Sequence, residues 1–471
     1  MEKFKKNLKM IFSNRIFIFI FAFTIMFLLL LGYKDLYGGS GDANQTWNVV
    51  TTFFKKHRTY SYVMYKGIYA FIPGVISYNL GVFFNINQFL FLKIINSLGF
   101  AYISTVGIPN LVKKLLNKKE IEIYKYYLFV LVFFLLENNV FCFISVDYYS
   151  ATLFILLCNI TIRLIENTKK TNLLLFGLFV GFNLSLSGQY SLATYLILVF
   201  ITIKLVSANL KTISKNNIFK LLICLGVVLG GYMITSLPNA IYEEYVVNYG
   251  RSKGEWIPKG SDWVKTGMTR DMLIINYPIT VPDNIGLSIM KARNDDIKLA
   301  KMGGSIYDYS DYVKIFMEYP IEFSTRIFER MFLGTINDYK NIGFVSSIHS
   351  NIKINLIAMI TFLYMSLSII KNKVKKVKDI LNYKTIIVLS SMLTIVPPSL
   401  LHVENRYYLY LRSLIIGTAI FGSSFKINKI NLKDIKDAKI NYGFVSYIIF
   451  LILCIALYIA IYQSLDGASL L

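Results

Sequence analysis

Asp42 is the residue of this chain whose type and position best suit chemistry. It lies in a glycine-rich, turn-prone stretch, residues 38–47, shortly after the first long apolar block. A carboxylate placed there could act as a general base that takes a proton from an attacking hydroxyl or amine. The alternative interpretation is a solvated loop aspartate, which is common beside glycines. Asp35 lies closer to the end of the apolar block and competes for the same role.

Asp147 is the second acidic candidate. It lies in the short segment 145–148, which joins two apolar blocks and is flanked by aromatic residues. A carboxylate at such a boundary could face the same cavity as Asp42. It could also be the N-cap of the following helix, and the two interpretations are compatible. Glu137 adds a further acid inside the preceding apolar block, where acids usually face a bundle interior or a wet cavity.

Arg406 is the basic candidate, in the polar stretch 401–408 that follows two prolines. Its guanidinium suits a phosphate because it donates two parallel hydrogen bonds. Glu404 could hold Arg406 in place, or the two could form an interfacial charge pair beside Tyr407. Four further residues could bind phosphate or sugar, or could simply be loop and cap residues: Lys55, Arg58, Gln189 and Tyr190.

Long apolar blocks must position these residues. Of the 471 residues, 55% are hydrophobic, and they form blocks rather than periodic stripes. The blocks have about 17 to 25 residues, the length that crosses roughly 30 Å of hydrocarbon. Continuous blocks exclude a barrel, so we expect an all-α membrane protein with about eleven transmembrane helices. The predicted spans are 16–32, 87–112, 126–145, 149–165, 171–187, 190–206, 218–237, 351–370, 384–401, 406–424 and 442–462.

The distribution of charge predicts the topology. Six segments hold 28 Lys and Arg residues against 7 Asp and Glu, which accounts for almost all of the net charge of +23. They are 1–15, 113–125, 163–170, 204–220, 371–384 and 426–439. The positive-inside rule assigns them to the cytoplasm, with the N-terminus inside and the C-terminus outside. The basic balance therefore indicates anionic lipid and does not call for nucleic acid.

Three regions follow from this layout. Residues 1–237 form an N-terminal transmembrane module whose first outside loop, 33–86, contains an interfacial helix over 63–78. Residues 238–350 form a large extracytoplasmic loop, with 13 Lys and Arg against 14 Asp and Glu, and with an amphipathic helix over 311–334. Residues 351–471 form a C-terminal transmembrane module.

The sequence lacks the motifs that are typical of several classes of protein. Walker, GxGxxG and HExxH motifs are absent, which argues against an ATP-driven pump, a dinucleotide enzyme and a zinc protease. The four cysteines lie in or beside apolar blocks without CxxC spacing, and there are only three histidines. We therefore expect no metal centre built from these residues.

The chain resembles the polytopic glycosyltransferases of the GT-C superfamily. One span is followed by an acidic first outside loop, then by many spans, a large outside loop and a late acid-x-Arg-Tyr element. Asp42 is placed like the family's first-loop acid, Asp147 like its second-loop aspartate, and Glu404-Asn405-Arg406-Tyr407 is similar to the late element. Ala43 stands where a second acid often follows, so a paired-acid site for a divalent metal is not supported.

The resemblance implies an inverting transfer of one sugar from a polyprenyl-phosphate donor, at the outer face of a bacterial plasma membrane. The acceptor would be a cell-surface glycan, lipid or protein. Asp42 would act as base, Arg406 would hold the donor phosphate and Asp147 would shape the site. Two alternatives remain: a polysaccharide polymerase of the O-antigen type, and a non-enzymatic flippase or transporter of lipid-linked glycans.

Overall fold

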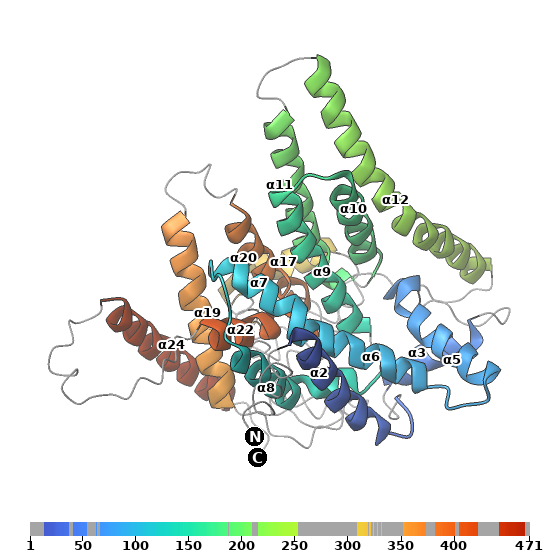
Figure 1. Cartoon of the computed structure of the whole chain (residues 1–471), viewed down its shortest axis with the longest axis horizontal. Helices are drawn as coiled ribbons and strands as arrows, with labels where there is room; N and C mark the ends of the chain where they lie inside the picture. Colours follow the sequence, from blue (N-terminus) through green and yellow to red (C-terminus); the bar gives the residue numbers. More distant parts are fainter. Residues whose placement is uncertain are drawn as a thin grey trace, which may run out of the picture.

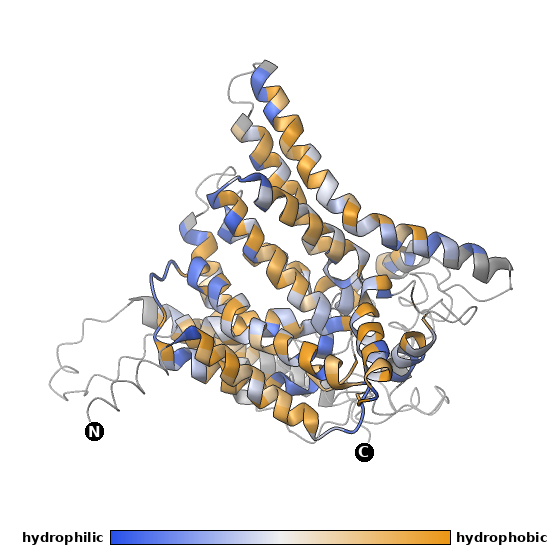
Figure 2. Cartoon of the chain, turned by 45° about the vertical axis from the view of Figure 1, so that its right-hand side comes forward, coloured by the Kyte–Doolittle hydropathy of each residue, from blue (hydrophilic) through white to orange (hydrophobic). Residues whose placement is uncertain are grey.

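The structure is a computed structural model. It describes residues 14–36, 41–53, 63, 66–144, 146–186, 188–209, 215–252, 309–318, 320–321, 324, 327, 331, 352–373, 382–400, 405–422 and 442–466. Every element in these ranges is helical and no strand occurs in them, as Figure 1 shows. By length and composition, six of the described helices can cross a membrane. Apolar side chains dominate their length (Figure 2), so the protein is an all-α protein embedded in a membrane.

Helical elements lie within all of the predicted spans, and six of the described helices are long and apolar enough to cross a membrane. The N-terminal bundle consists of α2 (Arg15–Leu31), α6 (Leu90–Tyr102), α7 (Ile108–Leu115), α8 (Ile123–Phe141) and α9 (Val146–Glu166). A π-helical turn, η2 (Ile103–Gly107), joins α6 to α7 in one continuous span. The helix α2 packs against α6 and α8, where the Phe21 and Tyr127 rings meet edge to face. The N-terminal bundle is therefore held together by apolar and aromatic helix faces.

The first loop is more helical than the sequence indicates. Its glycine-rich stretch begins a helix, α3 (Gly41–Thr52), where we predicted a turn. A 3-10 helix, η1 (Ile68–Ala70), and α5 (Ile72–Phe83) follow, in place of the predicted helix over 63–78. Gly67 precedes η1 with φ of 74°, a conformation that favours glycine. Pro73 lies in the first turn of α5, where its missing N–H has no cost.

Four elements follow α9: α10 (Lys170–Ser185), η3 (Gly188–Tyr190), α11 (Ser191–Asn209) and α12 (Lys215–Ser252). We predicted that the seventh span, 218–237, ends at residue 237, but α12 continues through Pro238 to Ser252. Contacts with η1 hold this continuation. Asn239 accepts a hydrogen bond from the Ile68 N–H at 2.9 Å, and the Tyr69 hydroxyl donates to the Thr235 carbonyl at 2.6 Å.

The helices α10 and α12 approach closely because glycines line their contact. A Cβ atom at Gly231 would overlap the backbone oxygen of Leu174, and one at Gly177 would overlap the backbone oxygen of Val228. By contrast, a Cβ atom at Gly230 would meet no atom within 4 Å. Small residues commonly permit such close backbone contact between membrane helices.

The C-terminal helices are α19 (Ile352–Lys373), α20 (Tyr383–Leu393), α21 (Val396–Leu400), η6 (Asn405–Tyr408), α22 (Leu409–Gly422) and α24 (Tyr442–Asp466). A separate helix, α17 (Tyr309–Glu318), lies in the predicted large loop. The most buried C-terminal helix is α22, which packs against α7, α8, α9 and α19 (Figure 1). A helix from the C-terminal part of the chain, α22, therefore lies at the centre of the bundle.

Adding one methyl group tests the glycine contact. Gly231→Ala should lower the free energy of unfolding by about 1–3 kcal/mol, because a backbone oxygen must move. Gly230→Ala, the matched control, should be neutral or stabilise by up to about 1 kcal/mol, because alanine has the higher helix propensity. Thermal unfolding of the purified protein in detergent measures both. Equal effects of the two substitutions would contradict the packing.

Candidate functional site

Two arginines of η6 and α22 lie inside the bundle. Arg406 is 6% exposed and Arg412 is 1% exposed. Each faces a carboxylate that comes from a different N-terminal helix. Charged groups inside a membrane protein are costly and usually mark functional sites. These two pairs define the candidate site.

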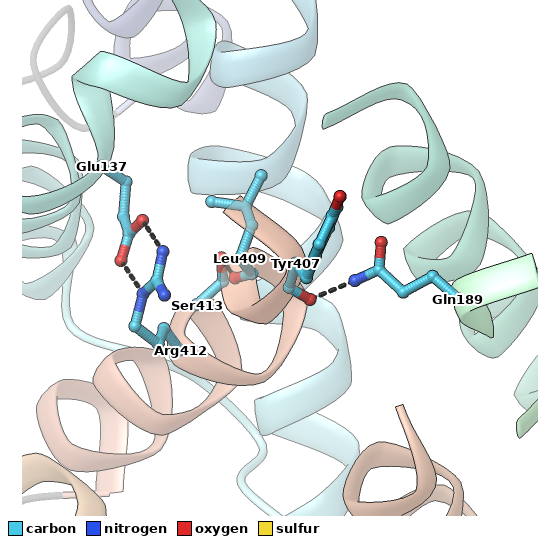
Figure 3. A network of polar contacts seen from close by, with 6 residues as sticks. All are labelled: Glu137, Gln189, Tyr407, Leu409, Arg412 and Ser413. Carbon is cyan, nitrogen blue, oxygen red and sulfur yellow. Dashed lines mark hydrogen bonds and ion pairs between the residues drawn. The ribbon is translucent and has the colours of Figure 1, made fainter. Parts of the chain in front are cut away.

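The first pair joins Arg412 to Glu137. The Arg412 Nε donates to Glu137 Oε1 and its Nη2 donates to Oε2, each at 2.6 Å. Figure 3 shows the two side chains pointing toward each other from α22 and α8. Both side chains are 1% exposed, so the pair is desolvated as a unit. A fork-to-carboxylate geometry of this kind fixes position strongly because two parallel bonds must both be satisfied.

The second pair joins Arg406 to Asp147. The distance from Arg406 Nε to Asp147 Oδ2 is 3.2 Å, and the side chains are 7% and 1% exposed. Asp147 occupies the first turn of α9, where the helix dipole favours a negative charge. The Arg406 guanidinium also lies 5.4 Å from the centre of the Tyr407 ring. An anion that approached this arginine would therefore meet a partly neutralised, aromatic-lined cation.

Polar and aromatic groups surround the second pair. Gln189 donates its side-chain N–H to the Tyr407 carbonyl, which ties η3 to η6 (Figure 3). The other amide atom of Gln189, Oε1, is buried and makes no hydrogen bond within the described part of the chain. Tyr190 stacks on Phe154 at a ring distance of 5.0 Å and meets Tyr410 edge to face. Amide and aromatic groups in this combination suit a sugar or another polyol.

The first loop begins at the same end of the bundle. The Ile144 N–H donates to the Leu36 carbonyl at 2.8 Å, three residues before Asp147 along the chain. Nearby, burial raises the pKa of Cys142 to about 11 and that of Tyr33 to about 12, so both groups stay protonated at neutral pH. We call this end, formed by residues 33–36, 142–144, 146–147, 188–190 and 405–408, the site end.

The structure brings together four of the residues that the sequence singled out: Asp147, Arg406, Tyr407 and Gln189. Tyr190 lies beside them, near enough for the charge of Asp147 to act on its hydroxyl. Asp35 is half-buried at the beginning of the first loop, near the Lys93 ammonium. Each of these positions is compatible with the predicted site.

The other predicted residues are only partly described. Asp42 is the second residue of α3, and the structure describes its backbone but not its side chain. Lys55, Arg58 and Glu404 lie outside the described residues. Within the described part of the chain, no three His, Cys, Asp or Glu residues form a cluster that could hold a metal ion.

Sequence reasoning missed Arg412. It noted Glu137 as an acid inside an apolar block but assigned it no partner. The signal was present, because Arg412 interrupts a long apolar run and Glu137 interrupts another. Two opposite charges within predicted spans should have been paired with each other.

Comparison of the chain with protein-family models, with curated proteins and with solved structures finds no match.

Removing one member of the inner pair tests its contribution. Glu137→Gln should lower the free energy of unfolding by about 3–5 kcal/mol, because Arg412 would remain buried without its counter-charge. Replacing both residues by methionine should recover most of this loss. The matched control is Glu166→Gln, which breaks the half-exposed Lys114–Glu166 pair and should cost at most about 1 kcal/mol.

Thermal unfolding of the purified protein in detergent ranks the three variants. If Glu137→Gln is no more destabilising than Glu166→Gln, the buried pair is not a structural constraint.

Proposed function

We propose that the chain is a polytopic glycosyltransferase of the GT-C type, which transfers one sugar from a polyprenyl-phosphate donor with inversion. The single observation that carries the proposal is the buried ion pair between Asp147 and Arg406 at the site end. Both residues belong to the order of acidic and basic elements in which the chain resembles this superfamily.

We propose a topology of about eleven spans with the N-terminus inside and the C-terminus outside. Two observations support it. Helical elements lie within the predicted spans, six of them long and apolar enough to cross a membrane, and the predicted alternation puts all the basic segments of the sequence on one side. The site end would then face the outer surface of a bacterial plasma membrane, where a lipid-linked donor and a cell-surface glycan, lipid or protein acceptor can meet.

The proposed reaction needs little acid assistance, because the polyprenyl phosphate leaves as a stabilised anion. Arg406 would hold that phosphate and stabilise the charge that develops on it as the glycosidic bond breaks. Asp147 would orient the guanidinium in the absence of donor and would yield part of its contact when the phosphate arrives. Asp42 would accept the proton of the acceptor hydroxyl or amine as the new bond to the anomeric carbon forms on the opposite face.

The surrounding residues would position substrates. Gln189 has a buried amide oxygen that could accept a hydrogen bond from a donor hydroxyl. The Tyr190 ring, buried against Phe154 and Tyr410, would hold η3 and therefore Gln189 in position. Positioning of this kind supplies a large share of the rate of a transfer reaction.

An assay with labelled donors tests the proposal. Purified protein in nanodiscs is incubated with polyprenyl-phosphate sugars and a cell-surface glycan fraction, and transfer of label to the acceptor is measured. Asp42→Asn should reduce the rate by about 10²–10⁴-fold, and Arg406→Gln by about 10²–10³-fold. The matched control is Glu120→Gln, an exposed acid-to-amide change away from the site end that should leave the rate unchanged.

Full activity of Asp42→Asn at normal protein levels would reject Asp42 as the base. Full activity of Arg406→Gln would reject the site itself. Polymer ladders made from lipid-linked repeat units would support the polymerase alternative, and movement of label across vesicles without transfer would support the flippase alternative.

A further inference from the structure

A basic cavity lies at the end of α9 opposite to Asp147. Its volume is about 470 Å³, and it is lined by the end of α7, the connection to α8 and the last turns of α9. The charged residues of its lining are Lys113, Lys114, Lys118, Lys119, Arg163 and Glu166. Five positive charges therefore face one negative charge, so the cavity carries a surplus of positive charge that an anion would neutralise.

Only part of that charge is satisfied by described residues. Glu166 pairs with Lys114 at 2.5 Å. Lys118 donates to the carbonyls of Phe421 and Gly422, the last two residues of α22. Lys113, Lys119 and Arg163 make no side-chain hydrogen bond or ion pair to another residue within the ranges that the structure covers.

The electrostatic environment of Lys118 points the same way. Burial, and next the charge of Lys125, lower the pKa of Lys118. The charge of Glu122 opposes this shift but does not cancel it. A bound phosphate would offset this, because it adds negative charge and several hydrogen-bond acceptors.

The position of the cavity matches the boundary of a membrane. Arg163 lies sixteen positions after Asp147 on α9, which corresponds to roughly 24 Å along the helix. This distance is close to the thickness of the hydrocarbon layer, about 30 Å. In the proposed topology, the cavity and the site end therefore lie at the two opposite membrane surfaces that α9 connects, with the cavity at headgroup depth.

We propose that this cavity binds a phosphate-bearing anion, and that the anion is the headgroup of an acidic phospholipid in the leaflet opposite to the site end. The volume suits a headgroup rather than a whole lipid, and basic pockets between transmembrane helices are known to bind anionic headgroups. This proposal does not depend on sugar transfer, because no residue of the site end lines the cavity. A soluble polyphosphate offers the same chemistry, so the experiment separates the two sources.

The experiment measures binding to the full chain in two arms. In the lipid arm, protein in phosphatidylcholine nanodiscs is titrated with fluorescent phosphatidylglycerol. In the soluble arm, the same protein is titrated with inorganic pyrophosphate. The test variant is Lys113→Gln combined with Arg163→Gln. The matched control combines Lys169→Gln with Lys170→Gln, two exposed cations at the start of α10 that do not line the cavity.

The test variant should weaken binding of phosphatidylglycerol by about 10–30-fold, since each basic residue near the surface contributes about 1 kcal/mol. The control should bind like the unmodified protein. If the unmodified protein binds only pyrophosphate, and the test variant loses this binding while the control keeps it, the phosphate site stands and its ligand is soluble. Equal binding by the test and control variants in both arms would overturn the proposal.

A second variant guards against misfolding of the first. Lys113→Arg combined with Arg163→Lys keeps both charges and should keep the affinity within about twofold, since both side chains remain cationic phosphate ligands. If this variant loses binding as completely as Lys113→Gln combined with Arg163→Gln while retaining its thermal stability, charge is not what the cavity recognises and the proposal fails.

Discussion

Pairing of buried charges fixes the position of α22 in the bundle. Arg406 and Arg412 lie inside the bundle, and each reaches a carboxylate of a helix that precedes it by more than 200 residues in the chain. A buried guanidinium without a counter-charge costs several kcal/mol, so α22 must keep one register relative to α8 and α9. Because Arg412 bonds Glu137 through two parallel contacts, a shift of α22 by one residue would leave both groups unpaired.

This constraint assembles the site end from distant segments. With α22 held against α8 and α9, η6 places Arg406 and Tyr407 beside Asp147, and Gln189 closes the contact through the Tyr407 carbonyl. The first loop joins through the hydrogen bond between Ile144 and Leu36. The C-terminal end of α22 accepts a hydrogen bond from Lys118, a residue that lines the basic cavity. One helix thus links the two surfaces that we propose to meet phosphate, at the two ends of α9.

The sequence predicted the helical class because apolar length is a local property, and six of the described helices are long and apolar enough to cross a membrane. The predictions from sequence were less accurate where tertiary contacts determine the structure. The end of α12 was missed because Asn239 and Thr235 dock on η1, a contact that no local pattern reveals. The turn predicted around Asp42 is the start of α3, since glycines and an aspartate also suit the first turn of a helix. The partner of Arg406 was predicted as its neighbour Glu404, whereas the structure adds Asp147, which is distant in the chain.

The central claim is that the pair of Asp147 and Arg406 receives the phosphate of a polyprenyl donor. A cryo-EM structure of the protein with undecaprenyl phosphate in nanodiscs tests it most directly. We expect phosphate oxygens within about 3 Å of the Arg406 guanidinium, a normal charge-assisted hydrogen bond, with the Asp147 carboxylate displaced. Phosphate density found only elsewhere, for example in the basic cavity at the other end of α9, with Arg406 still on Asp147, would contradict the account.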